Sequence, residues 1–120
     1  MKNILVVDDS PVVRQQVSLA LRAAGFVVFE AVDGMDGAEK IAATPSVSGV
    51  VCDVNMPRMN GLELVEEVMP RRPDLPILML TTESNPEIVQ RARKAGAKAW
   101  IIKPFRTEVL VAAVRKLVGG

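Results

Sequence analysis

The residues best placed to do chemistry in this 120-residue chain are three aspartates, Asp8, Asp9 and Asp53. The first two follow the apolar run at residues 4–7, and Asp53 follows a second apolar run at residues 50–52. Ionised carboxylates in a partly dry site repel one another, so their proximity is destabilising unless a cation neutralises them. A hard, oxygen-preferring cation such as Mg²⁺ suits these ligands. We therefore predict a Mg²⁺ site with Asp9 and Asp53 as direct ligands.

A carboxylate beside such a cation can accept a phosphoryl group, because the cation neutralises charge on the transferring oxygens. Thr81 and Lys103 each close a further apolar run and could contact the same oxygens. The chain has no histidine, which removes the commonest general base and transition-metal ligand. Phosphoryl transfer depends more on positioning and charge than on proton transfer. A histidine that takes part would therefore belong to a partner, and Cys52, without a histidine partner, is expected to be an inert core residue.

The elements that must position these residues are five apolar runs, each followed by a segment with helical periodicity. This alternation predicts an α/β fold, a doubly wound five-stranded parallel sheet with strand order 2-1-3-4-5. In that order strands one and three are neighbours, and ligands bind beyond the carboxyl ends of the strands. The order would gather Asp8, Asp9 and Asp53 and place Thr81 and Lys103 on the same rim. The expected strands lie near residues 3–8, 27–31, 49–53, 77–81 and 99–103, and the expected helices near 11–24, 35–43, 62–69, 86–95 and 107–118.

Composition narrows the class of protein. Fifteen basic and 14 acidic residues give a net charge of +1, so no strong basic field indicates nucleic acid as a partner. A single cysteine excludes an internal disulfide, and the first apolar run is too short for a signal peptide. Charged or polar residues interrupt every apolar run before the roughly 18 residues of a spanning helix. We predict one domain over residues 1–120, in the cytoplasm and without membrane insertion.

Four short runs stand at successive predicted strand ends: DDS at 8–10, DVNMP at 53–57, TTE at 81–83 and GAKAWIIKPF at 96–105. Together they resemble the receiver domain of two-component response regulators over the whole chain. The resemblance is closest to the single-domain chemotaxis regulators of the CheY type. It implies a flavodoxin-like (βα)5 fold, and since the CheY type is a known example of the strand order used above, that expectation is not independent of the resemblance.

The resemblance implies a role for each site residue. Asp53 would accept a phosphoryl group from a phosphohistidine on a sensor kinase, and the domain would also catalyse its own dephosphorylation without being a metabolic enzyme. Mg²⁺ would be held by Asp9, Asp53 and the backbone carbonyl of Asn55, with Asp8 acting through a metal-bound water. Lys103 would contact a phosphoryl oxygen, and its bond to Pro104 would be cis.

The resemblance also implies a conformational switch. The Thr81 hydroxyl would move to bond the phosphoryl group, and the aromatic position, Trp100, would turn inward. Asn55 and Glu83 occupy positions that tune the phosphoryl lifetime in this family. The family more often carries tyrosine or phenylalanine where this chain has Trp100, and the chain has no tyrosine. Coupling between Thr81 and the output face would be weaker than usual if the larger indole cannot be buried.

The implied partners are a sensor histidine kinase of the chemotaxis type, an output target such as a flagellar motor switch protein, and a phosphatase. Output partners of this family generally dock on the face made by the fourth helix, fifth strand and fifth helix. Four basic residues of the fourth helix and the turn after it are either part of that face or a solvated surface. These are Arg91, Arg93, Lys94 and Lys98.

Other functions remain open to different degrees. Phosphatases of the haloacid-dehalogenase type carry an aspartate two residues after the nucleophile, where this chain has Asn55. A flavin carrier of similar topology would need a phosphate-cradling loop and stacking aromatics, whereas aromatic residues make up 3% of this chain. The chain could also be the receiver half of a larger transcription regulator, or a degenerate receiver that acts as a binding module.

Overall fold

A five-stranded parallel sheet forms the centre of the protein. In the computed structural model, which describes residues 2–119, the strand order is β2-β1-β3-β4-β5. Every neighbouring pair is parallel, so the predicted doubly wound flavodoxin-like fold is confirmed. The strands are β1 (Asn3–Val7), β2 (Val27–Ala31), β3 (Val47–Cys52), β4 (Ile77–Thr81) and β5 (Ala99–Ile102).

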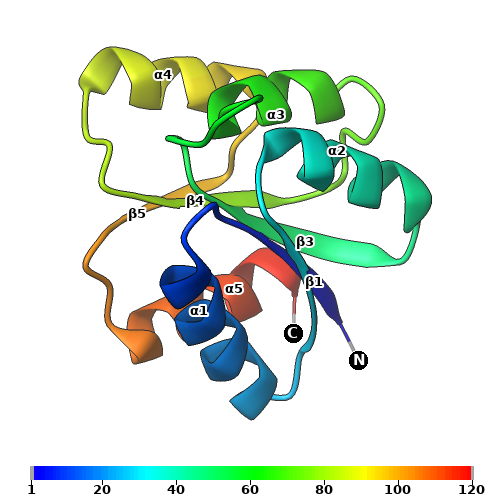
Figure 1. Ribbon diagram of the computed structural model, residues 1–120, viewed down its shortest axis with the longest axis vertical. Coiled ribbons are helices and arrows are strands. Elements are labelled where there is room, and N and C mark those ends of the chain that lie inside the picture. The colour runs from blue at the N-terminus through cyan, green and yellow to red at the C-terminus, as the bar shows by residue number, and fades with distance from the viewer. Residues whose placement is uncertain (1, 120) are drawn as a thin grey trace.

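Helices cover both faces of this sheet. Figure 1 shows α1 and α5 on one side of it and α2, α3 and α4 on the other. The helices are α1 (Pro11–Ala23), α2 (Gly34–Ala43), α3 (Gly61–Val68), α4 (Pro86–Ala95) and α5 (Thr107–Val118).

Local signals in the sequence explain most of the boundaries. The Ser10 hydroxyl accepts a hydrogen bond from the Val13 N–H and caps α1, and Asn85 caps α4 in the same way. The predicted bounds agree with the structure to within two residues. The largest difference is β3, which begins at Val47 because Val47 pairs with Asn3 across an irregular step in the ladder.

The sheet separates two apolar cores. Along β1, Ile4 and Val6 face the core under α1 and α5, whereas Leu5 and Val7 face the core under α2, α3 and α4. This alternation follows from the two-residue period of a strand, and because both faces are covered, residues 4–7 of β1 are all apolar. Cys52 is fully buried, and burial raises the pKa of its thiol. Both observations agree with the expectation that Cys52 is an unreactive core residue. Within residues 2–119 no helix is long and apolar enough to cross a bilayer.

Candidate functional site

Three carboxylates converge at the carboxyl ends of β1 and β3. One oxygen from each of Asp8, Asp9 and Asp53 lies within 4.8 Å of the others. The pairing of β1 with β3 causes this convergence, because the Asp53 N–H donates to the Val7 carbonyl at 3.0 Å. Asp8 and Asp53 are buried and Asp9 is exposed, so the cluster opens to solvent on the Asp9 side. The structure therefore brings together the three aspartates that the sequence singled out.

Lys103 reaches this cluster from the end of β5. Its Nζ donates to Asp8 Oδ2 at 2.8 Å and to Asp53 Oδ2 at 3.2 Å. Burial acts to lower the pKa of Lys103, but the two carboxylates outweigh burial and raise it. For Asp8 the balance is the reverse, since burial raises its pKa and the bond from Lys103 only partly opposes this. One ammonium cannot neutralise three carboxylates, so the site keeps an excess of negative charge that favours a cation.

A tight backbone approach orients the Asp53 carboxylate. The Val54 N–H donates to Asp53 Oδ1 at 2.7 Å, and the Val54 carbonyl accepts from the Gly61 N–H at 2.8 Å. A Cβ atom at Gly61 would lie 1.9 Å from the Asp53 carbonyl oxygen, so only glycine fits there. The helix expected near residues 62–69 left Gly61 outside it, and the sequence did not indicate this close approach. The available signal was a glycine at the start of the helix that follows Asp53.

Of the other predicted residues, Thr81 and Trp100 are linked through Glu83, whereas Asn55 lies on a separate loop. Thr81 ends β4 and is fully buried, and its hydroxyl oxygen accepts from the Glu83 N–H at 3.1 Å. The half-buried Trp100 donates its indole N–H to the Glu83 carbonyl at 3.0 Å. Thr81 and Trp100 are thus both bonded to Glu83 at the start of the β4–α4 loop. Asn55 is exposed on the loop after Asp53.

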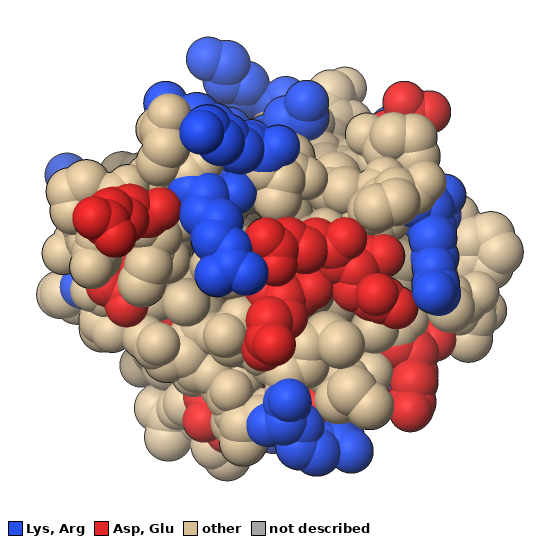
Figure 2. All heavy atoms as spheres, turned by 90° about the horizontal axis from the view of Figure 1, so that it is seen from above, with Lys and Arg blue, Asp and Glu red and all other residues tan. Residues whose placement is uncertain are grey.

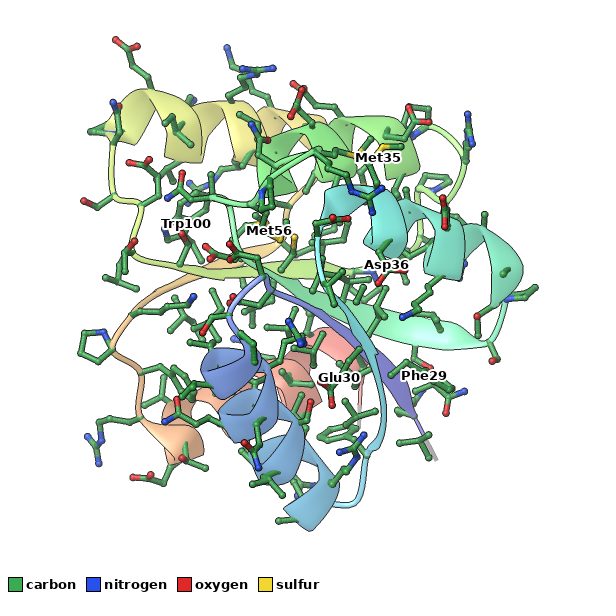
Figure 3. All side chains as sticks on the ribbon, in the orientation of Figure 1. Phe29, Glu30, Met35, Asp36, Met56 and Trp100 are labelled. Atoms are coloured by element: carbon green, nitrogen blue, oxygen red, sulfur yellow. The ribbon has the colours of Figure 1, made fainter. Side chains whose placement is uncertain are left out.

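The side chains around Trp100 lie on the α3 and α4 side of the sheet. Figure 3 shows Trp100 and Met56 there, and both pack against the core beneath those helices.

The Lys103–Pro104 peptide bond is cis, as the resemblance predicted. Arg14 was not anticipated from the sequence, although its guanidinium donates to the Asp8 carbonyl at 2.8 Å. No spacing rule in the sequence indicated that contact.

The basic residues of α4 and of the turn after it, which holds Lys98, divide into two groups. Arg91 makes two hydrogen bonds to the Glu66 carboxylate of α3, at 2.9 and 2.8 Å, so it joins two helices. Arg93, Lys94 and Lys98 are exposed. Figure 2 looks down on this side and shows an acidic area flanked by basic side chains. The face seen in Figure 2 therefore carries charges of both signs.

Comparison with known proteins gives a consistent family match. Residues 4–115 match the response regulator receiver domain. The chain is 39% identical to the chemotaxis protein CheY1 of Helicobacter pylori over 119 residues, which covers 97% of this chain and 96% of that protein. It is 35% identical over 118 residues to the transcriptional regulatory protein PdtaR of Mycobacterium tuberculosis, covering 98% of this chain and 57% of PdtaR.

Solved structures agree with this match. The chemotaxis protein CheY4 of Vibrio cholerae superimposes with a TM-score of 0.90 at 39% identity, covering 98% of both chains. A CheY from Borrelia burgdorferi, solved as a complex with CheX, BeF3 and Mg²⁺, superimposes with a TM-score of 0.92 at 26% identity, covering 96% of this chain and 87% of that one. Both superpositions agree with the strand order that was predicted from the sequence.

Proposed function

This chain belongs to the response regulator receiver domain family, and on that premise we propose that it is a phosphorylation-dependent switch whose acceptor is Asp53. The observation that best supports the proposal is the position of Asp53. Its carboxylate is buried, bonded to Lys103, and within 4.8 Å of two further carboxylates. A buried acidic group with one cationic neighbour and an excess of negative charge is suited to a metal-assisted reaction with an anion.

The donor set fits Mg²⁺. All three side chains of the cluster offer carboxylate oxygens, which this ion prefers, and the chain offers no histidine to favour a softer metal. Asp9, Asp53 and the backbone carbonyl of Asn55 would hold the ion directly, and Asp8 would act through a water molecule. When bound, Mg²⁺ supplies charge neutralisation on the transferring oxygens.

The residues of the chain would then divide the work of phosphoryl transfer. An Asp53 carboxylate oxygen attacks the phosphorus of a phosphohistidine on a partner. A P–O bond forms to Asp53 as the P–N bond breaks, and the imidazole leaves on the partner. Lys103, which already lies 3.2 Å from Asp53, stabilises the phosphoryl oxygens. The N–H of Val54 holds the carboxylate in orientation throughout. Hydrolysis of the aspartyl phosphate resets the switch.

Thr81 is placed to transmit the change. Its hydroxyl oxygen accepts from Glu83, so the hydroxyl proton is free to be donated to a phosphoryl oxygen. Movement of Thr81 toward the phosphoryl group would disturb Glu83, whose carbonyl accepts from the Trp100 indole. The two bonds at Glu83 thus provide a physical link from Asp53 to β5. Asn55 and Glu83 remain our candidates for setting the phosphoryl lifetime.

The partners we propose are a sensor histidine kinase of the chemotaxis type, an output target such as a flagellar motor switch protein, and a phosphatase, all meeting this protein in the cytoplasm. The identity to chemotaxis CheY proteins favours this choice, and a CheY relative was solved in complex with CheX. The face made by α4, β5 and α5 carries exposed apolar side chains, Ile102 and Val109, which suit an output partner.

A second candidate is the receiver unit of a longer transcription regulator. The match to PdtaR favours it, because that protein is longer than the region that the two share. The chemistry at Asp53 would be the same in both cases, and only the response to phosphorylation would differ. The size and domain content of the natural protein decide between the two, and these can be measured by mass spectrometry of the endogenous product.

The test is a titration of Mg²⁺ and then beryllium fluoride into the wild type and Asp53→Asn. Trp100 is the only tryptophan of the chain, so its fluorescence reports the site without an added label. We expect a saturable change in the wild type, with the beryllium fluoride step absent in Asp53→Asn. Labelling of Asp53 by a small phosphodonor, followed by mass spectrometry, should require Mg²⁺. Failure of both in the wild type would indicate a degenerate receiver that acts as a binding module.

A further inference from the structure

We propose that Arg58 and Asp33, which lie outside the acidic cluster, position the β3–α3 loop so that the Asn55 carbonyl faces the metal site. This inference rests on the proposed function, because it concerns a ligand of the proposed Mg²⁺ site. Arg58 and Asp33 would be positioning residues and would not contact the metal or the phosphoryl group. The loop in question covers residues 54–60, between Asp53 and the start of α3.

The first observation is a bidentate ion pair between two loops. Arg58 donates from Nε to Asp33 Oδ2 at 2.7 Å and from a terminal nitrogen to Asp33 Oδ1 at 3.1 Å. Asp33 is buried and also caps α2, since its Oδ1 accepts from the Asp36 N–H at 2.9 Å. These bonds lower the pKa of Asp33, Arg58 being the larger cause. Planar, charge-assisted pairs of this kind fix direction as well as distance.

The second observation is the backbone of Arg58 itself. Its φ is +66°, and among residues 2–119 it is the one non-glycine residue with a positive φ. This conformation is unfavourable for any residue with a Cβ atom, so the surrounding structure must hold it. The ion pair to Asp33 is a contact that can do so. Strain at a loop next to a functional site is a recognised form of pre-organisation.

A third observation shows that the loop is tied at two levels. Near its tip, the Gly34 N–H donates to the Met59 carbonyl at 3.0 Å, and a Cβ atom at Gly34 would lie 2.2 Å from that oxygen. At its base, the Gly61 N–H donates to the Val54 carbonyl. Asn55 lies between these ties, and among the hydrogen bonds found within residues 2–119 none involves Asn55. Its position therefore depends on the ties on either side of it.

The position of the Asn55 carbonyl matters because Mg²⁺ tolerates little displacement of its ligands. The ion requires near-ideal octahedral geometry with ligands at about 2.0–2.1 Å, so a carbonyl that is displaced even slightly is lost as a ligand. Partners that orient a ligand without touching the metal commonly change affinity by about 10- to 100-fold when they are removed. Loss of the Arg58–Asp33 pair should therefore raise the Mg²⁺ dissociation constant clearly while changing the melting temperature in a chelator only slightly.

The experiment compares this pair with a matched one. Among residues 2–119 a second arginine, Arg91, also makes two hydrogen bonds to one carboxylate, and the side chains of Arg58 and Arg91 are 58% and 60% exposed. Mg²⁺ dissociation constants would be measured by isothermal calorimetry for the wild type, Arg58→Ala, Asp33→Asn and Arg91→Ala, well below their melting temperatures. Melting in a chelator would report stability separately.

We expect Arg58→Ala and Asp33→Asn to raise the Mg²⁺ dissociation constant by about tenfold and Arg91→Ala to leave it unchanged. Asparagine remains a good helix N-cap, so Asp33→Asn tests the ion pair more than the cap. Arg58→Gly also removes the pair but tolerates the positive φ, which keeps the test valid if Arg58→Ala folds poorly. The double variant Asp33→Asn/Arg58→Gly should have the same Mg²⁺ dissociation constant as the single variant that binds Mg²⁺ less tightly, because both changes remove the same ion pair.

Folded Arg58→Ala or Arg58→Gly with the wild-type dissociation constant would overturn the inference, even if the melting temperature fell, because the pair would then be purely structural. An equal loss in Arg91→Ala would overturn it as well, since the effect would not be local. A wild type that bound no Mg²⁺ would instead overturn the proposed function, and the inference with it.

Discussion

The two sides of the acidic site are built differently. On one side, every residue of β3 from Gly49 to Cys52 is buried, and α3 buries five of its residues. On the other side, no residue of β5 is fully buried, and α4 buries only Ala92. We call the first side, made of β1, β3 and α3, the anchored side, and the second, made of α4 and β5, the responsive side. The carboxylates belong to the anchored side.

This difference suits the proposed switch, which requires one small domain to hold a site rigidly and still change shape. Segments with few buried apolar side chains open at lower free energy than the core strands. The responsive side is joined to the site through Lys103, through the two bonds at Glu83, and to α3 through the Arg91–Glu66 pair. Under the proposed function, a change of charge at Asp53 would act on the side that costs the least free energy to rearrange.

The largest expected effect is a difference in core packing between the sides. Leu64 of α3 is fully buried, so Leu64→Ala should lower the free energy of unfolding by about 2–5 kcal/mol. Ile88 of α4 is only partly buried, and Ile88→Ala should cost about 1 kcal/mol. Urea denaturation of both variants measures this. Equal losses would show that the two sides are anchored alike.

Mg²⁺ should stabilise the anchored side next most strongly. An ion that binds only the folded state at 100 times its dissociation constant adds about 2.7 kcal/mol. The melting temperature of the wild type should therefore rise with Mg²⁺. Asp53→Asn should melt at a higher temperature than the wild type in a chelator, because it removes one of the repelling carboxylates. Identical wild-type melting temperatures with and without Mg²⁺ would argue against the site.

The buried aspartates Asp8 and Asp33 should respond to pH with opposite signs. Burial raises the pKa of Asp8 above the unfolded value of 3.8, so its folded form binds the proton more tightly. Its contribution to stability therefore grows as the pH falls from neutral through that raised pKa. The pKa of Asp33 is lowered by Arg58, so its contribution is present above 3.8 and is lost as the pH falls through the lower folded pKa.

These signs can be read from two variants in a chelator. At pH 7, Asp8→Asn should raise the melting temperature, because it removes a carboxyl whose charged form is disfavoured by burial. Asp33→Asn should lower it by a smaller amount, because the partner of Asp33, Arg58, is 58% exposed. Calorimetric melting at pH 4 and pH 7 separates the two contributions. Shifts of the same sign would contradict the assigned causes.

The smallest predicted effect on stability concerns the responsive side. Trp100→Phe keeps an aromatic ring but removes the indole N–H that donates to Glu83. The expected cost is about 0.5–1.5 kcal/mol, the usual net value of one hydrogen bond. Beryllium fluoride should raise the affinity of the variant for an output partner by a smaller factor than it raises that of the wild type. This loss should exceed the factor that corresponds to the change in the free energy of unfolding. Retention of the full dependence would show that the indole bond does not couple Thr81 to β5.

The sequence predicted the fold because local and global signals agree. Ser10 and Asn85 mark helix starts by capping chemistry, and the apolar runs mark buried parallel strands. The positions of Asp8, Asp53 and Lys103 on one rim followed from the strand order, which was itself expected in part from the family resemblance. By contrast, the Arg58–Asp33 pair and the bond from Arg14 to the Asp8 carbonyl could not be predicted. Both depend on how loops meet in space, which no period in the sequence encodes.

The most direct test of the anchored and responsive sides is hydrogen exchange measured by mass spectrometry, with and without Mg²⁺ and beryllium fluoride. We expect the rates to change in the β4–α4 loop, α4 and β5, while β1 and β3 stay protected in both states. Asp53→Asn should show no response to beryllium fluoride. A change spread evenly over all five strands, or confined to α2 and α3, would contradict the account.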